Sequence, residues 1–538
     1  PPGEPSSQSQ ALVKAVGAAF SSVSVLNASF RRVPSVPGIP LGSTAESSGV
    51  DLLKVRKAYT TLVFELNNAE LVNTLGRATV SICDELSKHK IPTDDPETLC
   101  VFLVVFENPL LLAEHRTSLF AGFHVALQRL TAAVLSLPKE SQKLLFGWLK
   151  HLPSEYFGRV VDVMQQYVTY VLTQPGQNQG DVSAAVMMLK TLWDVNAEMD
   201  GILPEWCFQS FAISQSNDLQ EHYRQWQQQQ SLVFSYCRYP FLLNAGAKRR
   251  LLSFDVDLRS QVASQEIWAK MMREVDAMEV EAKFQQLLIY RVRREHIFSD
   301  FCGQIWWRLQ NMPECLCLPL TVDFLGEQGI DAGGLRKECL HLVLRELYST
   351  QLFTELDECP GLLWFQPFQQ RSCVKAPAPT VPTVLYDESW TEHLPEVAGA
   401  IVGLAVYNAI YLDFRLHPLM YRFLVHKNVN ANFEDLQSLH PTLYRSLTLL
   451  RKHDIRSLCL TWSVRLPGAP EDVPLGGRAR EEPVEPEELE VFIKQYAEAA
   501  LYGGNEVQIR DFVKSALLCM NVGPAFSLCT ANDLELLI

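Results

Sequence analysis

The sequence lacks an uncharged apolar run long enough to cross a lipid bilayer. A spanning helix needs roughly 18 to 20 such residues. The most apolar uncharged run, residues 397–412, reads VAGAIVGLAVYNAIYL and is shorter than that. The N-terminal end also lacks the charged-then-apolar pattern of a secretory signal. We therefore expect no membrane span, and we expect residues 397–412 to form a buried helix.

Basic charge is also scarce. The formal net charge is −14, whereas binding to nucleic-acid phosphates requires a concentrated basic surface. The short basic runs at 248–250 and 291–294 are expected to be solvated faces or salt-bridge partners. We therefore expect no nucleic-acid partner.

The motifs of common cofactor sites and hydrolases are missing. Leu335-Arg336 follows the last glycine of a glycine-bearing turn, where a phosphate loop requires lysine and then serine or threonine. No G-x-S-x-G or H-E-x-x-H string occurs. The cysteine and histidine residues that lie closest in sequence do not have the spacing of a zinc site. They are Cys315, Cys317, Cys339, His341, Cys359 and Cys373. No metal and no cofactor is predicted.

The number and spacing of the cysteines indicate the cellular compartment. There are 13 of them, an odd number, and they are scattered along the chain rather than spaced as a disulfide framework. Free thiols of this kind are typical of a reducing environment. A cytoplasmic location is expected.

What the chain does contain is apolar periodicity. Apolar residues make up 47% of its 538 residues, so most of it should fold, and into more than one core. Residues 1–49 are expected to be a flexible, partly helical lead-in, because proline, glycine and serine are frequent in 1–10 and 33–49. Residues 50–216 are expected to be all-helical, since apolar residues recur there at intervals of three and four. The helices are predicted at 52–67, 71–88, 96–106, 118–137, 140–152 and 155–172.

The best-specified segment is 320–348, which reads LTVDFLGEQGIDAGGLRKECLHLVLRELY. Alternation of apolar and polar residues predicts a strand over 320–325. Glycines then supply backbone freedom through a turn, and Asp331 is expected to cap the helix that follows. On the residues alone this is a strand, a turn and a helix.

The composition of that segment nevertheless resembles the signature of the HECT ubiquitin-ligase domain, near the start of its large N-terminal lobe. The matching positions are Phe324, Gly326, Glu327, Gly329, Asp331, Gly333, Gly334, Lys337 and Glu338. Two earlier segments, 234–241 and 284–298, are similar to family landmarks that precede the signature. The helix expected at 397–412 is similar to the family's core helix, where Gly399 and Gly403 on one face allow close packing.

Residues 435–450 read DLQSLHPTLYRSLTLL and form the second informative segment. Pro441 suits the first turn of a helix, and Leu443, Leu447 and Leu450 recur at i, i+4 and i+7. On the residues alone, such a stripe packs inward.

The family resemblance implies another role for the same helix, which in HECT ligases lends its apolar face to the groove that receives the ubiquitin-conjugating enzyme. The positions that fall on this groove are Leu443, Leu447, Leu450 and Phe492. His453 stands where the family often has an aromatic residue, which would weaken the groove or change which conjugating enzyme fits. The acidic, proline-rich and glycine-rich residues 466–488 are expected to form a mobile surface loop.

No catalytic cysteine is assigned. HECT ligases carry ubiquitin as a thioester on a cysteine of a C-terminal lobe, whereas Cys519 and Cys529 lie in the apolar contexts ALLCM and FSLCT, without the family's Thr-Cys-Phe surround. We expect the reactive cysteine beyond Ile538, and we expect this chain alone to be inactive. Residues 20–30 and 49–52 are similar to the central region of the smaller HERC ligases, although no propeller repeats occur.

The prediction is a mainly α fold: a helical N-terminal region followed by the α+β N-terminal lobe of a HECT domain at 217–538, with 414–502 as its small conjugating-enzyme-binding subdomain. The implied function is that of a HECT-type ubiquitin ligase fragment, whose partners are a ubiquitin-conjugating enzyme, ubiquitin and protein substrates. The alternative is a truncated, non-catalytic scaffold that sequesters conjugating enzymes or substrates.

Overall fold

The computed structural model describes residues 7–32, 43–88, 96–112, 122–173, 179–228, 233–274, 289–327, 333–366, 388–453, 455–466, 469, 471–520 and 522–538. They form two compact units, unit 1 over Pro1–Ala247 and unit 2 over Lys248–Ile538. This division falls later in the chain than residue 217, where the sequence predicts the second domain to begin.

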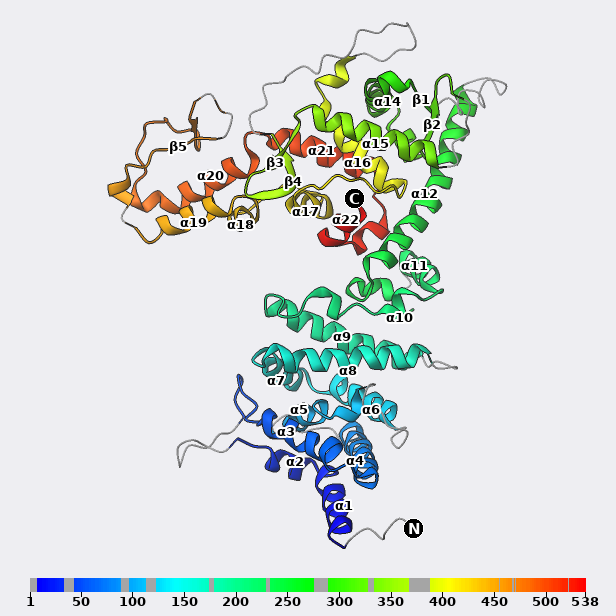
Figure 1. Cartoon of the computed structure of the whole chain (residues 1–538), viewed down its shortest axis with the longest axis vertical. Coiled ribbons are helices and arrows are strands. Elements are labelled where there is room, and N and C mark those ends of the chain that lie inside the picture. The colour runs from blue at the N-terminus through cyan, green and yellow to red at the C-terminus, as the bar shows by residue number, and fades with distance from the viewer. Residues whose placement is uncertain are drawn as a thin grey trace. The chain divides into compact units, whose positions relative to one another are not determined.

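Unit 1 consists of helices (Figure 1). They are α1 Ser7–Phe20, α2 Val23–Ser29, α3 Leu52–Thr60, α4 Ala69–Lys88, α5 Cys100–Phe106, α6 Phe123–Ser136, α7 Lys139–Lys150, α8 Ser154–Thr173, α9 Gln179–Glu198, α10 Phe211–Ser214 and α11 Leu219–Gln227. The predicted helices within 50–172 are therefore confirmed where residues are described.

Amphipathic faces hold unit 1 together. Helix α4 packs against α1 and α6, and α8 packs against α9. Leu71, Leu75 and Ile82, which recur on one face of α4, are almost completely buried. Two polar side chains in this core pair with each other: the buried Asn108 side chain donates a 2.8 Å hydrogen bond to the Thr79 hydroxyl. Unit 1 thus has a core of its own.

Unit 2 adds short strands to the helices. After α12 Ala245–Glu274, which begins just before the unit boundary, its helices are α14 Ile297–Asn311, α15 Gly334–Ser349, α16 Leu394–Tyr407, α17 Pro418–His426, α18 Leu436–Leu439, α19 Pro441–Leu450, α20 Leu489–Tyr502, α21 Glu506–Cys519 and α22 Ala531–Leu537. Its strands are β1 Ile289–Val292, β2 Thr321–Phe324, β3 Phe353–Leu356, β4 Cys359–Phe365, β5 Ser463–Val464 and β6 Val473–Pro474.

The strand predicted at 320–325 is confirmed as β2, which pairs in parallel with β1 so that Tyr290 lies opposite Val322. The predicted turn glycine Gly329 and the predicted cap Asp331 lie outside the described residues. Gly333, with a φ of 103°, occupies the N-cap position of α15. That left-handed conformation explains why glycine is found there.

The acidic residues of the signature segment have a structural role. The Arg294 guanidinium donates to the Glu327 carboxylate at 2.5 and 2.9 Å and to Glu338 at 2.6 Å. It also lies 4.4 Å from the centre of the Phe324 ring. These hydrogen bonds lower the pKa of Glu327. One arginine therefore ties together the end of β2 and the first turns of α15.

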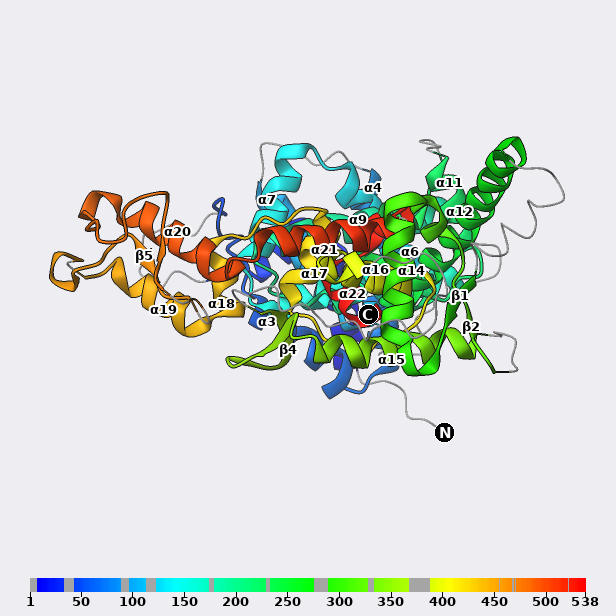
Figure 2. The same cartoon turned by 90° about the horizontal axis from the view of Figure 1, so that it is seen from above.

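Helices α16 and α21 form the centre of unit 2, where they lie along each other (Figure 2). Both predicted contact glycines face α21: a Cβ at Gly399 would stand 2.1 Å from the Phe512 carbonyl oxygen, and one at Gly403 would stand 2.4 Å from that of Ala516. The prediction of close packing is confirmed. The predicted end of this helix at 412 is wrong, because α16 ends at Tyr407 and Ala409 adopts a φ of 53°.

Helices α19 and α20 and the β5–β6 pair project together to one side of unit 2 (Figures 1 and 2). Helix α17 packs instead against α21 and α22. The prediction of a mobile surface loop at 466–488 is wrong for the described residues. Val473 and Pro474 pair with β5, and Leu475 and Val484 are buried. Pairing with β5 gives this proline-rich segment a defined path.

A mainly α fold with few, short strands is thus confirmed. Among the described residues, no individual helix has the length and apolarity needed to span a membrane. The pair Gln10–Phe20 and Val23–Ser29 meets that test only when the two are taken together, and the chain bends by 102° between them.

Candidate functional site

The predicted docking helix, α19, forms where the sequence places it. Pro441 occupies the first turn, where its missing N–H costs no helical hydrogen bond. The Glu358 carboxylate, from the β3–β4 turn, accepts a 3.1 Å hydrogen bond from the Thr442 N–H. The start of α19 is therefore anchored to the main part of unit 2.

The predicted contact residues differ in exposure. Leu447 and Phe492 are buried, 3% and 2% exposed, and belong to the hydrophobic core. Leu443 and Leu450 are half-buried against the same core, and His453 is exposed. A partner would therefore touch Leu443, Leu450 and His453 directly, while Leu447 and Phe492 support them from inside.

Aromatic contacts stiffen that interior. The Phe492 ring meets Trp462 edge to face at a centroid distance of 5.6 Å, and it meets Tyr496 in the same way at 5.6 Å. The Arg478 guanidinium lies 4.1 Å from the Trp462 ring centre. Tyr496 was not among the predicted residues, although it follows Phe492 by one helical turn and the i, i+4 spacing could have identified it.

An ion pair joins the exposed ends of α19 and α20. The Arg451 guanidinium donates two hydrogen bonds of 2.9 Å to the Glu490 carboxylate, and these bonds lower the pKa of Glu490. Arg451 also lies 4.8 Å from the centre of the Phe433 ring. The two helices thus meet on the surface through a planar, bidentate contact.

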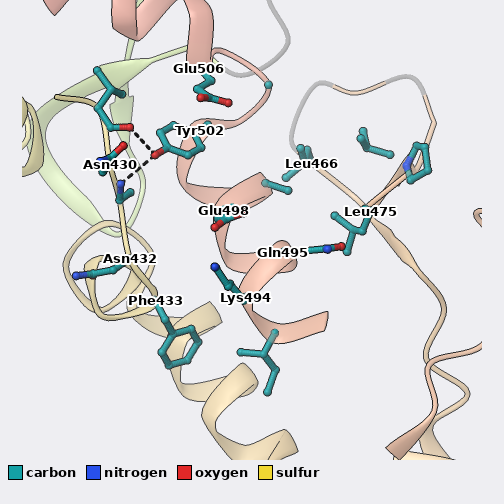
Figure 3. A pocket seen from close by; sticks show the side chains of 18 of the residues that line it. Asn430, Asn432, Phe433, Leu466, Leu475, Lys494, Gln495, Glu498, Tyr502 and Glu506 are labelled. Atoms are coloured by element: carbon teal, nitrogen blue, oxygen red, sulfur yellow. Dashed lines mark hydrogen bonds between the residues drawn. The ribbon is translucent and has the colours of Figure 1, made fainter. Parts of the chain in front are cut away.

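A cavity of about 1160 Å³ lies beside these helices (Figure 3). In Figure 3, Asn430, Asn432 and Phe433 flank one side of α20, and Leu466 and Leu475 flank the other. None of the five predicted contact residues lines the cavity. Its lining comes from segments far apart in sequence, so periodicity could not have revealed it.

One wall of the cavity is fixed by a tyrosine. The Tyr502 hydroxyl donates to the Val429 carbonyl at 2.8 Å and accepts from the Ala431 N–H at 2.9 Å, as the dashed lines of Figure 3 mark. The described lining includes carboxylates, amides, Lys494 and Arg451 but no cysteine, serine or histidine. This chemistry favours binding over nucleophilic catalysis.

The described cysteines are mostly buried. Burial raises the pKa of Cys529 to about 12, helped by the negative charge of Asp533, and burial likewise raises the pKa of Cys519. A thiol of this kind is a poor nucleophile, because the thiolate is the reactive form. Cys459 is exposed, and Cys373 lies outside the described residues. No group of three histidine, cysteine, aspartate or glutamate side chains able to hold a metal ion occurs among the residues that the structure describes.

Unit 2 contains the strand of the signature segment, the closely packed α16–α21 pair and the helix α19, which are the elements that the sequence resemblance led us to expect. Residues 341–538 match the family model described as HECT-domain (ubiquitin-transferase). The resemblance to HECT-type ubiquitin ligases, and to those of the HERC kind, is confirmed by this match and by the named relatives.

Three relatives are informative. The probable E3 ubiquitin-protein ligase mug30 of Schizosaccharomyces pombe is 26% identical over 458 residues, which cover 81% of this chain and 51% of that protein. Probable E3 ubiquitin-protein ligase HERC3 of Homo sapiens is 27% identical over 458 residues, which cover 81% of this chain and 39% of that protein. Probable E3 ubiquitin-protein ligase HECTD2 of Homo sapiens is 24% identical over 460 residues, which cover 81% of this chain and 54% of that protein. The chain therefore spans about half or less of these relatives.

Proposed function

We propose that this chain docks a ubiquitin-loaded conjugating enzyme through the exposed face of α19. The observation that carries the proposal is the arrangement of Leu443 and Leu450, half-buried on a helix whose inner face is fixed by Leu447. Apolar side chains held on a rigid helix are suited to a protein partner, because little conformational entropy is lost when they are covered.

In the mechanism proposed for the whole ligase, docking brings two thiols together. A ligase thiolate attacks the carbonyl carbon of the ubiquitin thioester, and the thiolate of the conjugating enzyme leaves. The amine of a substrate lysine then attacks the new thioester, which forms an isopeptide bond and releases the ligase thiol. The acyl group stays activated throughout, so the transfer uses no cofactor. A cytoplasmic location remains part of this proposal.

The test is affinity for a panel of ubiquitin-conjugating enzymes, measured by isothermal titration calorimetry. Leu443→Asp places a charge in the proposed contact and should weaken binding about tenfold or more. Leu449→Asp is the matched control, since Leu449 lies on the same helix and is 50% exposed. At 3.6 residues per turn it lies about 100° or more around the helix from Leu443 and Leu450. The control should change the affinity less than about twofold.

Circular dichroism melting must show that both variants remain folded. Equal losses of affinity in the two variants would assign the contact to another face of α19. If no conjugating enzyme in the panel binds the unmodified chain, the proposed docking is wrong.

A scaffold that binds conjugating enzymes without accepting ubiquitin is the second candidate function. The burial of Cys519 and Cys529 favours it for this 538-residue chain. Mixing the chain with a ubiquitin-charged conjugating enzyme, then running a gel with and without reductant, distinguishes the two. A reductant-sensitive ubiquitin adduct on the chain supports transfer, whereas binding without an adduct supports the scaffold.

A further inference from the structure

The connector between α9 and α10, residues 199–210, and the first residue of α10 expose large apolar side chains in unit 1. Trp206 is 71% exposed, Phe211 is 74% exposed and Ile202 is 43% exposed. Trp206 lies in the short 3-10 helix η5, Glu205–Cys207, and both η5 and α10 pack against α8. Side chains of this size are normally covered, and several within one connector mark an interaction surface. We call this surface, made by Ile202, Trp206 and Phe211, the connector patch.

The backbone beneath the connector patch is rigid. The buried Asn196 side chain donates to the Leu203 carbonyl and accepts from the Leu203 N–H, both at 2.9 Å. The Ser210 N–H donates to the Leu242 carbonyl at 2.8 Å. Between these two points Phe208 is completely buried and meets the Trp193 ring edge to face at 5.2 Å.

This arrangement decides the direction of the neighbouring side chains. With Phe208 inside, Trp206 and Phe211 are held outside on a fixed support. A partner that covers them loses little entropy in ordering the chain, and tryptophan in particular contributes strongly to binding when buried at an interface.

The charge around the connector patch is acidic. From residue 190 to residue 218 the sequence contains Asp194, Glu198, Asp200, Glu205 and Asp218 but only one basic residue, Lys190. Lys190 forms an ion pair with Asp194 at 2.6 Å, and Glu198 pairs with Lys150 of α7. Among the residues that the structure describes, Asp200, Glu205 and Asp218 have no lysine or arginine partner within 4.0 Å.

Helix α8 adds a further acid. Asp162 is exposed, and its charge acts on Cys207, whose pKa is raised first by burial and then by this carboxylate. Carboxylates are thus present on α8, close to Cys207, and on the connector that carries the apolar side chains. Negatively charged membranes and nucleic acids would be repelled, whereas lysine or arginine side chains would be attracted.

We propose that the connector patch binds a basic, amphipathic segment of a partner protein, with apolar side chains covering Trp206 and Phe211 and with lysine or arginine facing Asp200, Glu205 and Asp162. This site lies in unit 1 and does not depend on the docking proposed for α19.

The experiment is phage display of random dodecapeptides on the 538-residue chain, with counter-selection on the double variant Trp206→Ser/Phe211→Ser. Both positions are exposed, so the variant should keep its fold, which a melting curve checks. Enriched peptides are expected to combine at least two apolar residues with net positive charge. A synthetic enriched peptide, followed by fluorescence anisotropy, should bind the double variant about tenfold or more weakly.

Two further variants separate the roles of charge and apolar surface. Asp200→Lys/Glu205→Lys should weaken the peptide severalfold and reduce the effect of added salt on its affinity. Leu53→Ser is the matched control, because Leu53 is 74% exposed in α3 of the same unit, and it should leave the affinity unchanged.

The proposal is overturned if no enriched peptide loses affinity for the double variant, or if the enriched peptides are neutral or acidic. It is also overturned if the chain self-associates in analytical ultracentrifugation and the double variant does not, because a second copy would then cover the connector patch.

Discussion

At the scale of single residues, two glycines set the distance between α16 and α21. A methyl group at position 399 would stand 2.1 Å from the Phe512 carbonyl oxygen, and that oxygen belongs to helix backbone that cannot rotate away. Gly399→Ala should therefore lower the free energy of unfolding, measured by urea denaturation, by about 1–3 kcal/mol or more. The matched control is Gly334→Ala, where no atom lies within 4 Å of the added methyl, and its stability should not decrease. Equal effects of both variants would contradict the close approach.

A buried histidine provides a pH-dependent contribution to stability. His417 is the N-cap of α17: its Nδ1 accepts from the Leu419 N–H at 3.2 Å, and its Nε2 faces the Ser438 carbonyl at 3.1 Å. Both contacts fit a neutral imidazole that carries its proton on Nε2. Burial is the main cause that lowers the pKa of His417, and burial also lowers the pKa of His440.

The sign of the effect follows from linkage. At pH values below the unfolded-state pKa of about 6.5, the unfolded chain binds more protons than the folded chain, so stability falls as the pH falls. Urea unfolding at several pH values between about 7.5 and 5 should show this loss. His417→Asn keeps a side-chain oxygen for the cap and removes one titrating ring, so the slope should become smaller. An unchanged slope would mean that His417 does not titrate differently in the two states.

At the scale of elements, α12 is attached to α22 by a buried ion pair. Lys248 and Asp533 are 2% and 4% exposed, and the ammonium lies 2.5 Å from the carboxylate. Lys248→Met would leave an uncompensated buried carboxylate and should cost about 3–5 kcal/mol of unfolding free energy. The double variant Lys248→Met/Asp533→Asn removes both charges and should be more stable than Lys248→Met alone. Equal stability of the single and double variants would show that the carboxylate finds another partner or water.

Sequence periodicity predicted the elements better than their ends and contacts. The helices of unit 1, β2 and α19 follow from repeating apolar positions, and the close approach at Gly399 was expected from the family resemblance. The end of α16 was missed because Ala409 adopts a left-handed conformation that its side chain does not signal. The order within 466–488 was missed because it arises from pairing with β5, a contact between separate segments.

At the candidate site, too, the sequence predicted the helix but not the contacts that its side chains make. The i, i+4, i+7 spacing identified the stripe Leu443, Leu447 and Leu450, but it could not tell that Leu447 is buried in the core while Leu443 and Leu450 are only half-buried. The cavity beside α20 and the connector patch were invisible to periodicity, because each depends on side chains brought together by folding. Burial of Leu447 therefore decides that Leu443, and not Leu447, is the position to substitute in a binding test.

At the scale of the whole molecule, unit 2 has what it needs to fold without unit 1. The buried residues of its large hydrophobic cluster all lie between Tyr290 and Ile538, and Leu252 of α12 packs against them. The chain end is built into it, since the Leu412 N–H donates to the Ile538 carbonyl at 2.9 Å. Helix α12 contributes through Lys248 and through Ile267, which packs with Cys315. The natural start for such a fragment is Asn244, whose side chain accepts from the Ala247 N–H and caps α12.

We expect residues 244–538 to unfold in one cooperative transition and, if α19 is the docking helix, to bind the same conjugating enzymes as the full chain within about twofold. Residues 289–538 are the matched comparison: they keep β1 but lose α12, which leaves Asp533 without Lys248, so this shorter fragment should melt at a lower temperature. Calorimetry of both fragments gives the two melting temperatures and the affinities. If the 244–538 fragment lacks a cooperative transition, the core of unit 2 depends on unit 1. If it folds but does not bind while the full chain does, docking requires a surface of unit 1 as well as α19.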